Sequence, residues 1–320
     1  MKSRLLLVAF YCWAHALAAQ KPGYIVWTID WNPKEPVAAV GGDDSLLRFF
    51  QIPELMVVET VRVPTMIRCV QWHPDGRLLA IATARGIFLF DFTTKQLVKW
   101  PNAPAARALD WKPTGDQLVV ADLDGKVTFW SRDGVLLRSI QKITNGETDM
   151  NSFFSVDWHP TKNIVVTGGD EIRIYSSDGR EVNFVKHRKE QTGVLSVQWH
   201  PSGSFFASGD YGHHSEGVES LIQFWSGNGK LINTLNGSIA EYRNLRWNKS
   251  GTRLATASDA LRLWNEQASK LFASPSNTTQ PLWGISWHRD GQALITSSSN
   301  GVISLWDSNG RLLRTTRRDE

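Results

Sequence analysis

Short stretches in which apolar and polar residues alternate recur along the whole chain. One of them, residues 282–287 (LWGISW), has the period of two that predicts a half-buried strand, and turns such as 200–204 (HPSGS) follow stretches of this kind. Next come an apolar run such as 164–169 (IVVTGG), a Gly/Asp/Asn turn and another alternating stretch such as 302–306 (VISLW). Several units add a two-residue turn and a fourth stretch, as in 308–316 (SNGRLLRTT). The pattern predicts units of four antiparallel strands.

A tryptophan at the end of the first predicted strand marks each unit, usually in the motif WHP or a near variant. Seven such anchors lie 39 to 48 residues apart: Trp31, Trp72, Trp111, Trp158, Trp199, Trp247 and Trp287. A second aromatic residue closes each unit: Phe50, Phe90, Trp130, Tyr175, Trp225, Trp264 and Trp306. Four strands in each period predict an all-β fold, a seven-bladed β-propeller of four-stranded antiparallel blades. Because the last unit has its own fourth strand, we expect the ring to close by packing of the first and last blades, without a shared sheet.

The repeat resembles the WD-repeat β-propeller family over residues 24–320. Residues 304–307 (SLWD) carry the dipeptide of that family intact. The Gly-His dipeptide of the family is missing, with His187 as its nearest relic. The chain therefore resembles a divergent member of the family, and one that is bacterial-like and bears a signal peptide. This loss weakens any transfer of the family's His/Asp/Ser/Trp hydrogen-bonded network. The family's turn position is still matched by Asp44, Asp124 and Asn300.

The first residues have the character of a secretory signal peptide. Two basic residues precede an apolar run at 5–13, and residues 16–18 (ALA) form a small-x-small cleavage signal. We therefore predict a signal peptide at 1–18, a propeller at 19–320, a secreted or periplasmic location, and no stable membrane insertion after cleavage. Two alternatives stay open. The segment could be an N-terminal strand, or the mature protein could begin at Met1 as a cytoplasmic scaffold.

The net charge and the cysteine content argue against nucleic-acid binding and against an internal disulfide. The formal net charge is +4, from 35 basic and 31 acidic residues, and this close balance gives little support for nucleic-acid binding. Cys12 lies inside the predicted signal peptide, which leaves Cys69 as the single cysteine of the mature chain. No internal disulfide is then possible, and we expect Cys69 to be a small buried residue of a monomeric fold.

A column of large and chemically varied side chains stands four residues before the anchors. It reads Trp27, Arg68, Arg107, Phe154, Leu195, Arg243 and Trp283. We expect it at the top entrance of the central channel, where the top is the face on which loops enter the innermost strands. Arginine and tryptophan are enriched at binding hot spots, and guanidinium groups favour carboxylate or phosphate. The predicted recognition site, named the mouth ring, consists of Trp27, Arg68, Arg107, Phe154, Arg243 and Trp283. In the alternative, the arginines plug the channel by pairing with acids such as Asp30, Asp110 or Asp157.

The fifth unit is longer than the others, because its second aromatic follows the anchor by 26 residues instead of the usual 17 to 19. The extra residues lie in 211–219 (YGHHSEGVE), and two further long top-face loops are expected at 141–152 and 186–193. The predicted binding residues of this specificity loop are Asp210, Tyr211, His213, His214 and Glu216. Four of them, Asp210, His213, His214 and Glu216, have zinc-ligand chemistry, but adjacent histidines of a strand point to opposite sides, which favours a solvated hairpin extension without metal.

The sequence carries no recognisable signature of catalysis. It lacks G-x-S-x-G, H-E-x-x-H and a P-loop. We therefore expect a non-catalytic scaffold, without a cofactor, that binds a protein or peptide through the top face. The alternative is a propeller enzyme, or a binder of a small anionic or metal-associated ligand, that uses the mouth ring and the long loop of the fifth unit.

Overall fold

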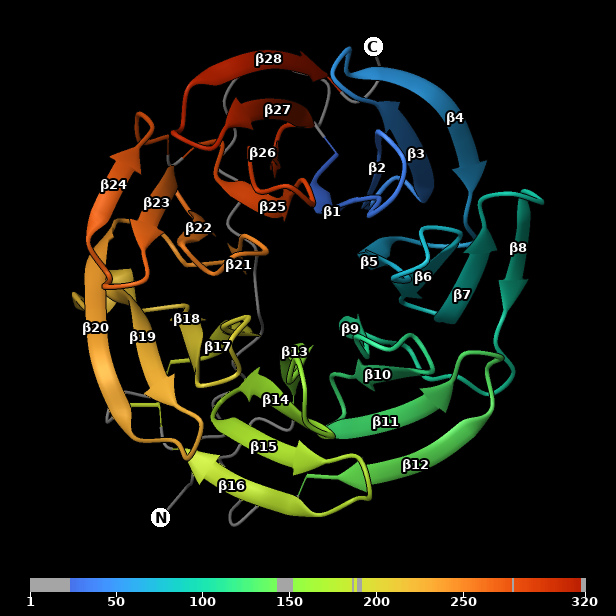
Figure 1. The fold of residues 1–320 in the computed structure, drawn as a ribbon, viewed down its shortest axis with the longest axis horizontal. Helices are drawn as coiled ribbons and strands as arrows, with labels where there is room; N and C mark the ends of the chain where they lie inside the picture. The colour runs from blue at the N-terminus through green and yellow to red at the C-terminus, as the bar shows by residue number, and fades with distance from the viewer. Residues whose placement is uncertain (1–23, 143–151, 186, 189–191, 278, 318–320) are drawn as a thin grey trace, which may run out of the picture.

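Seven four-stranded antiparallel sheets stand around a common axis (Figure 1). The computed structural model describes residues 24–142, 152–185, 187–188, 192–277 and 279–317. Each sheet is built from four consecutive strands, which confirms the predicted all-β, seven-bladed propeller. The predicted signal peptide at 1–18 lies outside the described residues. Along the described part of the chain, no helix is both long and apolar enough to cross a bilayer.

The strands follow the chain from blade to blade. Blade 1 comprises β1 (Val26–Trp31), β2 (Val37–Gly42), β3 (Leu46–Gln51) and β4 (Met56–Arg62); blade 2 comprises β5 (Ile67–Trp72), β6 (Leu78–Thr83), β7 (Gly86–Asp91) and β8 (Gln96–Lys99); blade 3 comprises β9 (Ala108–Trp111), β10 (Gln117–Ala121), β11 (Lys126–Ser131) and β12 (Leu136–Gln141). Blade 4 comprises β13 (Phe153–Trp158), β14 (Ile164–Gly169), β15 (Ile172–Ser176) and β16 (Glu181–Val185); blade 5 comprises β17 (Val194–Trp199), β18 (Phe205–Asp210), β19 (Ser220–Ser226) and β20 (Leu231–Ser238), with a 3-10 turn η1 (His214–Glu216). Blade 6 comprises β21 (Asn244–Trp247), β22 (Arg253–Ala257), β23 (Leu261–Asn265) and β24 (Lys270–Ala273); blade 7 comprises β25 (Leu282–Trp287), β26 (Ala293–Ser298), β27 (Val302–Asp307) and β28 (Leu312–Arg317).

The hydrophobic core lies between neighbouring blades. The anchor Trp72 packs against Phe49 of the preceding blade with 5.9 Å between ring centroids, and Trp158 packs against Phe129 at 5.6 Å. The second strand of a blade is enclosed on both faces, as in β2 and β6, whereas the fourth strand alternates, as in β4, because its outer face meets solvent. Each anchor therefore joins two blades, which explains why its spacing equals the blade period.

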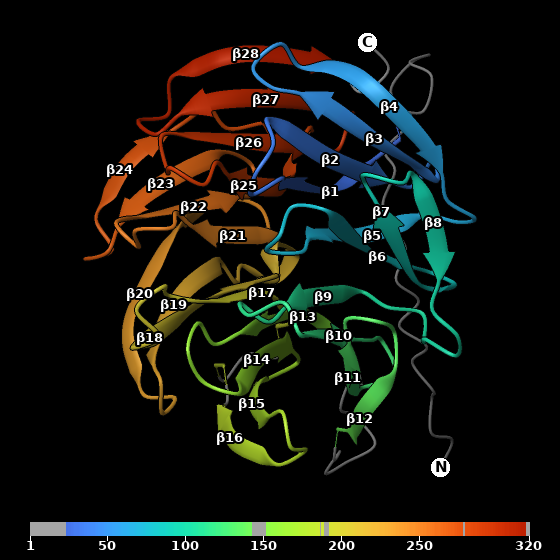
Figure 2. The same ribbon diagram turned by 45° about the vertical axis from the view of Figure 1, so that its right-hand side comes forward.

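The ring closes where blade 1 meets blade 7, as Figures 1 and 2 both show. β1 and β25 belong to different sheets, so closure without a shared sheet is confirmed. Hydrogen bonds join these sheets: the Trp31 N–H donates to Ser286 Oγ at 2.9 Å, Ser286 Oγ donates to Asp30 at 3.0 Å, and Ser297 Oγ donates to the Val26 carbonyl at 3.2 Å. Side-chain packing and these bonds take the place of strand pairing at the seam.

A ring of hydrogen bonds, named the anchor girdle, connects the innermost strands. In six of the seven interfaces, the side chain just before one anchor accepts the backbone N–H of the next anchor, at 2.6 to 2.9 Å. The acceptors are Asp30, Gln71, Asp110, Asp157, Gln198 and Ser286. At the remaining interface the equivalent residue is Arg246, whose guanidinium cannot accept, and its backbone carbonyl instead receives the Trp287 indole N–H at 2.9 Å.

Candidate functional site

A repeated β-bulge shapes the inner strands four residues before the anchors. In blade 1, Val26 pairs with Gly42 and Thr28 with Gly41, so Trp27 is left out of the ladder. The same shift occurs in β5, β13, β17 and β25. A bulge bends its strand and redirects the extra side chain, often beside a functional site. The residues redirected in this way are Trp27, Arg68, Phe154, Leu195 and Trp283.

Arg107 and Arg243 occupy the same place just before β9 and β21. Their backbone N–H groups donate to the carbonyls of Ala121 and Ala257, at 3.1 and 3.0 Å. All seven side chains of the column are half-buried. The column predicted from the sequence is thus set apart by backbone geometry and burial as well as by its residue types.

Side chains of the mouth ring meet across the channel entrance. The indoles of Trp27 and Trp283, from blades 1 and 7, are in edge contact at 4.5 Å between centroids. The guanidinium of Arg243 lies 3.6 Å from the Trp283 ring centroid. Arg107 extends from blade 3 past blade 2 to lie 5.4 Å from the Trp27 ring. These contacts join blades 1, 3, 6 and 7 into one cluster, whereas the Phe154 ring of blade 4 lies next to Gly193 of blade 5.

The mouth ring carries more positive than negative charge. Arg243 forms an ion pair with Glu241 at 3.2 Å. Within the described part of the chain, neither Arg68 nor Arg107 lies within ion-pair distance of a carboxylate. Burial lowers the pKa of Arg68, and burial together with repulsion from Arg68 and Arg243 lowers the pKa of Arg107 to about 10.

The acids of the same strands serve the anchor girdle, so the pairing expected in the plug alternative does not form. Asp30, Asp110 and Asp157 accept backbone N–H groups of Trp72, Trp158 and Trp199. Burial raises the pKa of Asp30 and Asp110 to about 6 and that of Asp157 well above its usual range, although Arg246 opposes each shift. Three residues of strand separate the girdle from the mouth ring, roughly 10 Å. The channel therefore has a cationic entrance above an acidic layer.

In blade 5, Asp210 is structural and does not belong to the exposed loop. Its side chain is fully buried and accepts the Leu221 N–H at 2.7 Å and the His187 Nε2 proton at 2.8 Å. In the same blade, the Trp225 indole N–H donates to Ser208 Oγ at 2.9 Å. These contacts are of the His/Asp/Ser/Trp kind found in the WD-repeat family. We had not expected them, because the chain lacks the Gly-His dipeptide. His187 thus takes the place of the missing dipeptide in this blade.

The two histidines of the blade 5 loop have different partners. His213 Nδ1 lies 3.3 Å from Glu216, and His214 Nε2 lies 3.0 Å from Ser220 Oγ. In the described ranges no three histidine, cysteine or acidic side chains are grouped so that they could hold a metal ion. Tyr211, His213 and Glu216 are all at least one third exposed. The loop therefore offers polar contacts at the surface. Most of the two other long loops, at 143–151, 186 and 189–191, lies outside the described residues.

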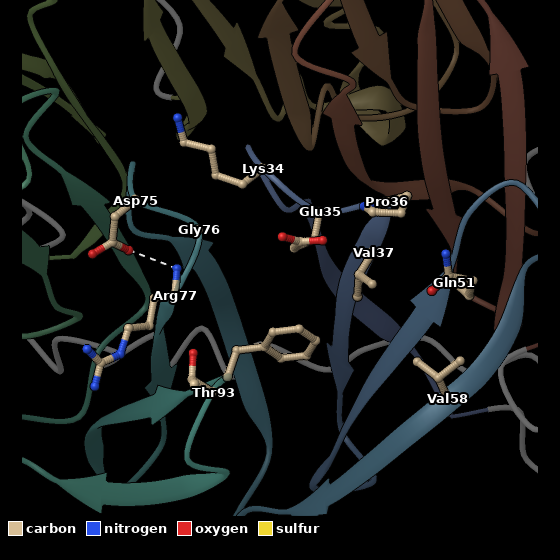
Figure 3. A pocket seen from close by; sticks show the side chains of 11 residues that line it. Lys34, Glu35, Pro36, Val37, Gln51, Val58, Asp75, Gly76, Arg77 and Thr93 are labelled. Carbon is tan, nitrogen blue, oxygen red and sulfur yellow. Dashed lines mark hydrogen bonds between the residues drawn. The ribbon is translucent and has the colours of Figure 1, made fainter.

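A groove of about 720 Å³ opens between blades 1 and 2 (Figure 3). Turns that follow β1 and β5 line it, so it lies at the opposite end of the inner strands from the mouth ring. Lys34 and Glu35 lie on one wall, and Asp75 and Arg77 lie on the other. No motif of the sequence indicates this groove, because turn and strand residues of two separate repeats form it. Arg77 is already paired with Asp91 at 2.6 Å, and Asp75 is paired with an arginine of blade 3 at 2.7 Å. We therefore consider the mouth ring the stronger candidate.

Comparison with protein families agrees with this geometry. Residues 56–183 match the model described as Eukaryotic translation initiation factor eIF2A. Residues 181–226 and 269–307 match the model described as WD domain, G-beta repeat. Each WD match covers the fourth strand of one blade and the first three strands of the next. The chain is a seven-bladed β-propeller with WD40 repeats at residues 181–226 and 269–307.

The WD40-repeat propeller also has distant relatives among characterised proteins. The Serine-threonine kinase receptor-associated protein of Mus musculus is 26% identical over 190 residues, 58% of this chain and 52% of that protein. The protein of the same name in Gallus gallus is 24% identical over 258 residues, 78% of this chain and 70% of that protein. The Ribosome biogenesis protein BOP1 homolog of Drosophila persimilis is 25% identical over 152 residues, 42% of this chain and 19% of that protein. The chain thus spans about half the length of the mouse relative. These animal relatives give no support to a bacterial-like origin or to a signal peptide.

Proposed function

We propose that this WD40-repeat propeller is a non-catalytic scaffold that binds a protein or peptide over the top entrance of its channel. The observation that carries the proposal is the mouth ring, in which equivalent positions on separate blades bring arginine and tryptophan side chains into one cluster. Arg107 alone reaches past a whole blade to Trp27, at 5.4 Å. Such a cluster on a rigid scaffold has the composition of a binding hot spot.

The names of the relatives fit a protein partner. The mouse protein is named as receptor-associated, and at 26% identity this supports only the class of function. Beside the mouth ring, the exposed loop residues Tyr211, His213, His214 and Glu216 would widen the contact surface, whereas the buried Asp210 is left out of it. We also propose that residues 1–18 direct secretion, which sequencing of the mature N-terminus will test.

A triple Arg68/Arg107/Arg243→Ala variant tests the proposal in quantitative pull-downs with the full chain as bait. The matched control replaces three arginines that lie on outer strands or turns, Arg138, Arg180 and Arg311, by alanine. We expect the mouth-ring variant to lose its partners and the control to keep them. A folded mouth-ring variant that retains every partner would refute the proposal. If the triple variant does not fold, single Arg68→Ala and Trp283→Leu variants give the same readout.

A further inference from the structure

We infer that the partner presents an acidic peptide segment, in which a carboxylate next to an apolar side chain enters the mouth ring. This inference rests on the proposed function and adds the chemistry of the ligand. It follows from the donors, the charges and the apolar surface that the ring offers.

The mouth ring offers hydrogen-bond donors and few acceptors. Guanidinium groups and indole N–H groups only donate. In the described part of the chain, the guanidinium groups of Arg68 and Arg107 have no hydrogen-bond acceptor, and the same holds for the indole N–H groups of Trp27 and Trp283. The carboxylate of Glu241, next to Arg243, is the nearby acceptor. A ligand that matches this surface must bring acceptors, and a carboxylate accepts two N–H donors of one guanidinium at once.

Charge favours an anion at this place. Repulsion from Arg68 and Arg243 contributes to the lowered pKa of Arg107, so a negative charge between them would relieve a repulsion that the free protein carries. The guanidinium of Arg107 lies 5.4 Å from the Trp27 ring centroid, and this cation–π contact leaves its N–H groups able to donate. The contacts of Arg107 and Arg243 with the indoles therefore restrain both guanidinium groups at the entrance, where a carboxylate would bind.

The anion should stop at the entrance. Roughly 10 Å further down the channel lie Asp30, Asp110 and Asp157, whose carboxylates already serve the anchor girdle. These three acids already share the charge of Arg246, so a further carboxylate at this depth would add uncompensated negative charge to a buried layer, which is costly. The arginines at the entrance and the acids below them therefore favour a ligand whose carboxylate stays at the mouth ring. Any ligand group that enters the channel further should be neutral.

The apolar members of the column indicate a peptide instead of a free ion. Trp27 and Trp283 are in contact at the entrance, and Phe154 and Leu195 stand at the equivalent positions of blades 4 and 5; all four side chains are half-buried, so their exposed parts offer apolar surface to a ligand. A carboxylate beside a leucine-like side chain supplies both parts. Single-stranded RNA could also combine negative charge with stacking, but it needs a basic groove along the backbone, and the chain has nearly balanced charge.

Selection from a random-sequence peptide library on the immobilised full chain tests the inference. We expect the selected peptides to be enriched in aspartate or glutamate next to an apolar residue. The most enriched peptide, labelled with a fluorophore, is then compared in anisotropy titrations with a twin in which amides replace the carboxylates. The twin should bind at least about tenfold more weakly, because a charge-assisted hydrogen bond contributes about 1.5–3 kcal/mol.

Variants of the chain connect this affinity to the ring. Arg68→Ala and Arg107→Ala should each weaken binding about tenfold or more. The exposed Arg180→Ala control should leave it unchanged. Arg107→Lys should recover only part of the affinity, because lysine keeps the charge without the planar fork. Added salt should weaken binding of the acidic peptide more than that of its amide twin.

Three outcomes would overturn the inference: selected peptides without acidic residues, equal binding of the peptide and its amide twin, and displacement of the peptide by inorganic phosphate alone or by polyuridine. If pull-down partners are lost in the mouth-ring variants while the acidic peptide fails these tests, the proposed function stands and the ligand chemistry is wrong. If the mouth-ring variants keep every partner, the proposed function itself fails.

Discussion

The charge of Asp30 in the anchor girdle gives a sharp test of how the channel is built. Its carboxylate accepts the Trp72 N–H at 2.7 Å and the Ser286 hydroxyl at 3.0 Å, so the folded protein needs an acceptor here. The folded protein does not need the negative charge, because burial raises the pKa of Asp30 to about 6. The positive charge of Arg246 also stabilises the carboxylates of Asp110 and Asp157, so it only partly offsets the cost of ionising Asp30. An Asp30→Asn variant keeps an oxygen acceptor and removes the charge.

The size of the effect follows from the pKa. In the unfolded chain an aspartate has a pKa of about 3.9, and each unit of difference corresponds to about 1.4 kcal/mol. A folded-state pKa that is raised to about 6 means that this carboxyl favours folding most below pH 4, and that this contribution is lost as the pH rises through about 6. At pH 8, ionisation of Asp30 therefore lowers the free energy of unfolding by at most about 3 kcal/mol. Because the side chain is only half-buried, we expect a loss of about 1–2 kcal/mol.

Urea unfolding followed by tryptophan fluorescence at about pH 4.5 and pH 8 measures this difference. The Asp30→Asn variant should be more stable than the natural chain at pH 8 by about 1–2 kcal/mol, and the gain should shrink at pH 4.5. The control is Gln198→Leu, which removes an uncharged acceptor of the Trp247 N–H and should cost about 1–3 kcal/mol at both pH values. A variant that is less stable at pH 8, or a gain that is equal at both pH values, would refute the reasoning.

Three further predictions concern blade 5, the seam and the histidine loop. Asp210→Ala should lower the free energy of unfolding by about 3–5 kcal/mol in urea titrations, because buried charged and polar partners lose their acceptor; His187→Ala should cost less, about 1–3 kcal/mol. Gly284→Ala should lower it by about 1–3 kcal/mol, since the added Cβ would lie 3.0 Å from a backbone nitrogen of β1 at the seam. Zinc added to the full chain should give no binding heat in calorimetry, because His213 and His214 have separate partners.

The sequence predicted the blades well because each repeat carries its own strands, turns and anchor. Spacing of Trp31 and its six equivalents sets both the number of blades and the interfaces that they form. The anchor girdle was not predicted, since its acceptors are Asp, Gln or Ser, and a column of mixed residues shows no pattern. Only the arrangement of successive blades in the structure shows that Asp30 accepts the backbone N–H of Trp72 in the next repeat.

In blade 5, too, the sequence did not reveal which residues are in contact. A search for Gly-His finds no network, yet His187 reaches the buried Asp210 from a loop of different sequence. The insertion after Asp210 made this residue look like part of an exposed loop, although it ends β18 inside the blade. Its burial could not be inferred from spacing, because insertions shift the boundary between a strand end and a loop.

The mouth ring was predictable in composition but not in charge balance, and the reason connects the scaffold to its proposed function. The sequence places Asp30, Asp110 and Asp157 on the same strands as the arginines or on neighbouring ones, so pairing was a reasonable alternative. The structure assigns these acids to backbone N–H groups of the next blade, and they cannot neutralise Arg68 or Arg107 as well. Interactions that hold the innermost strands together thereby leave the entrance cationic, and an acidic partner would complete the charge balance that the fold leaves open.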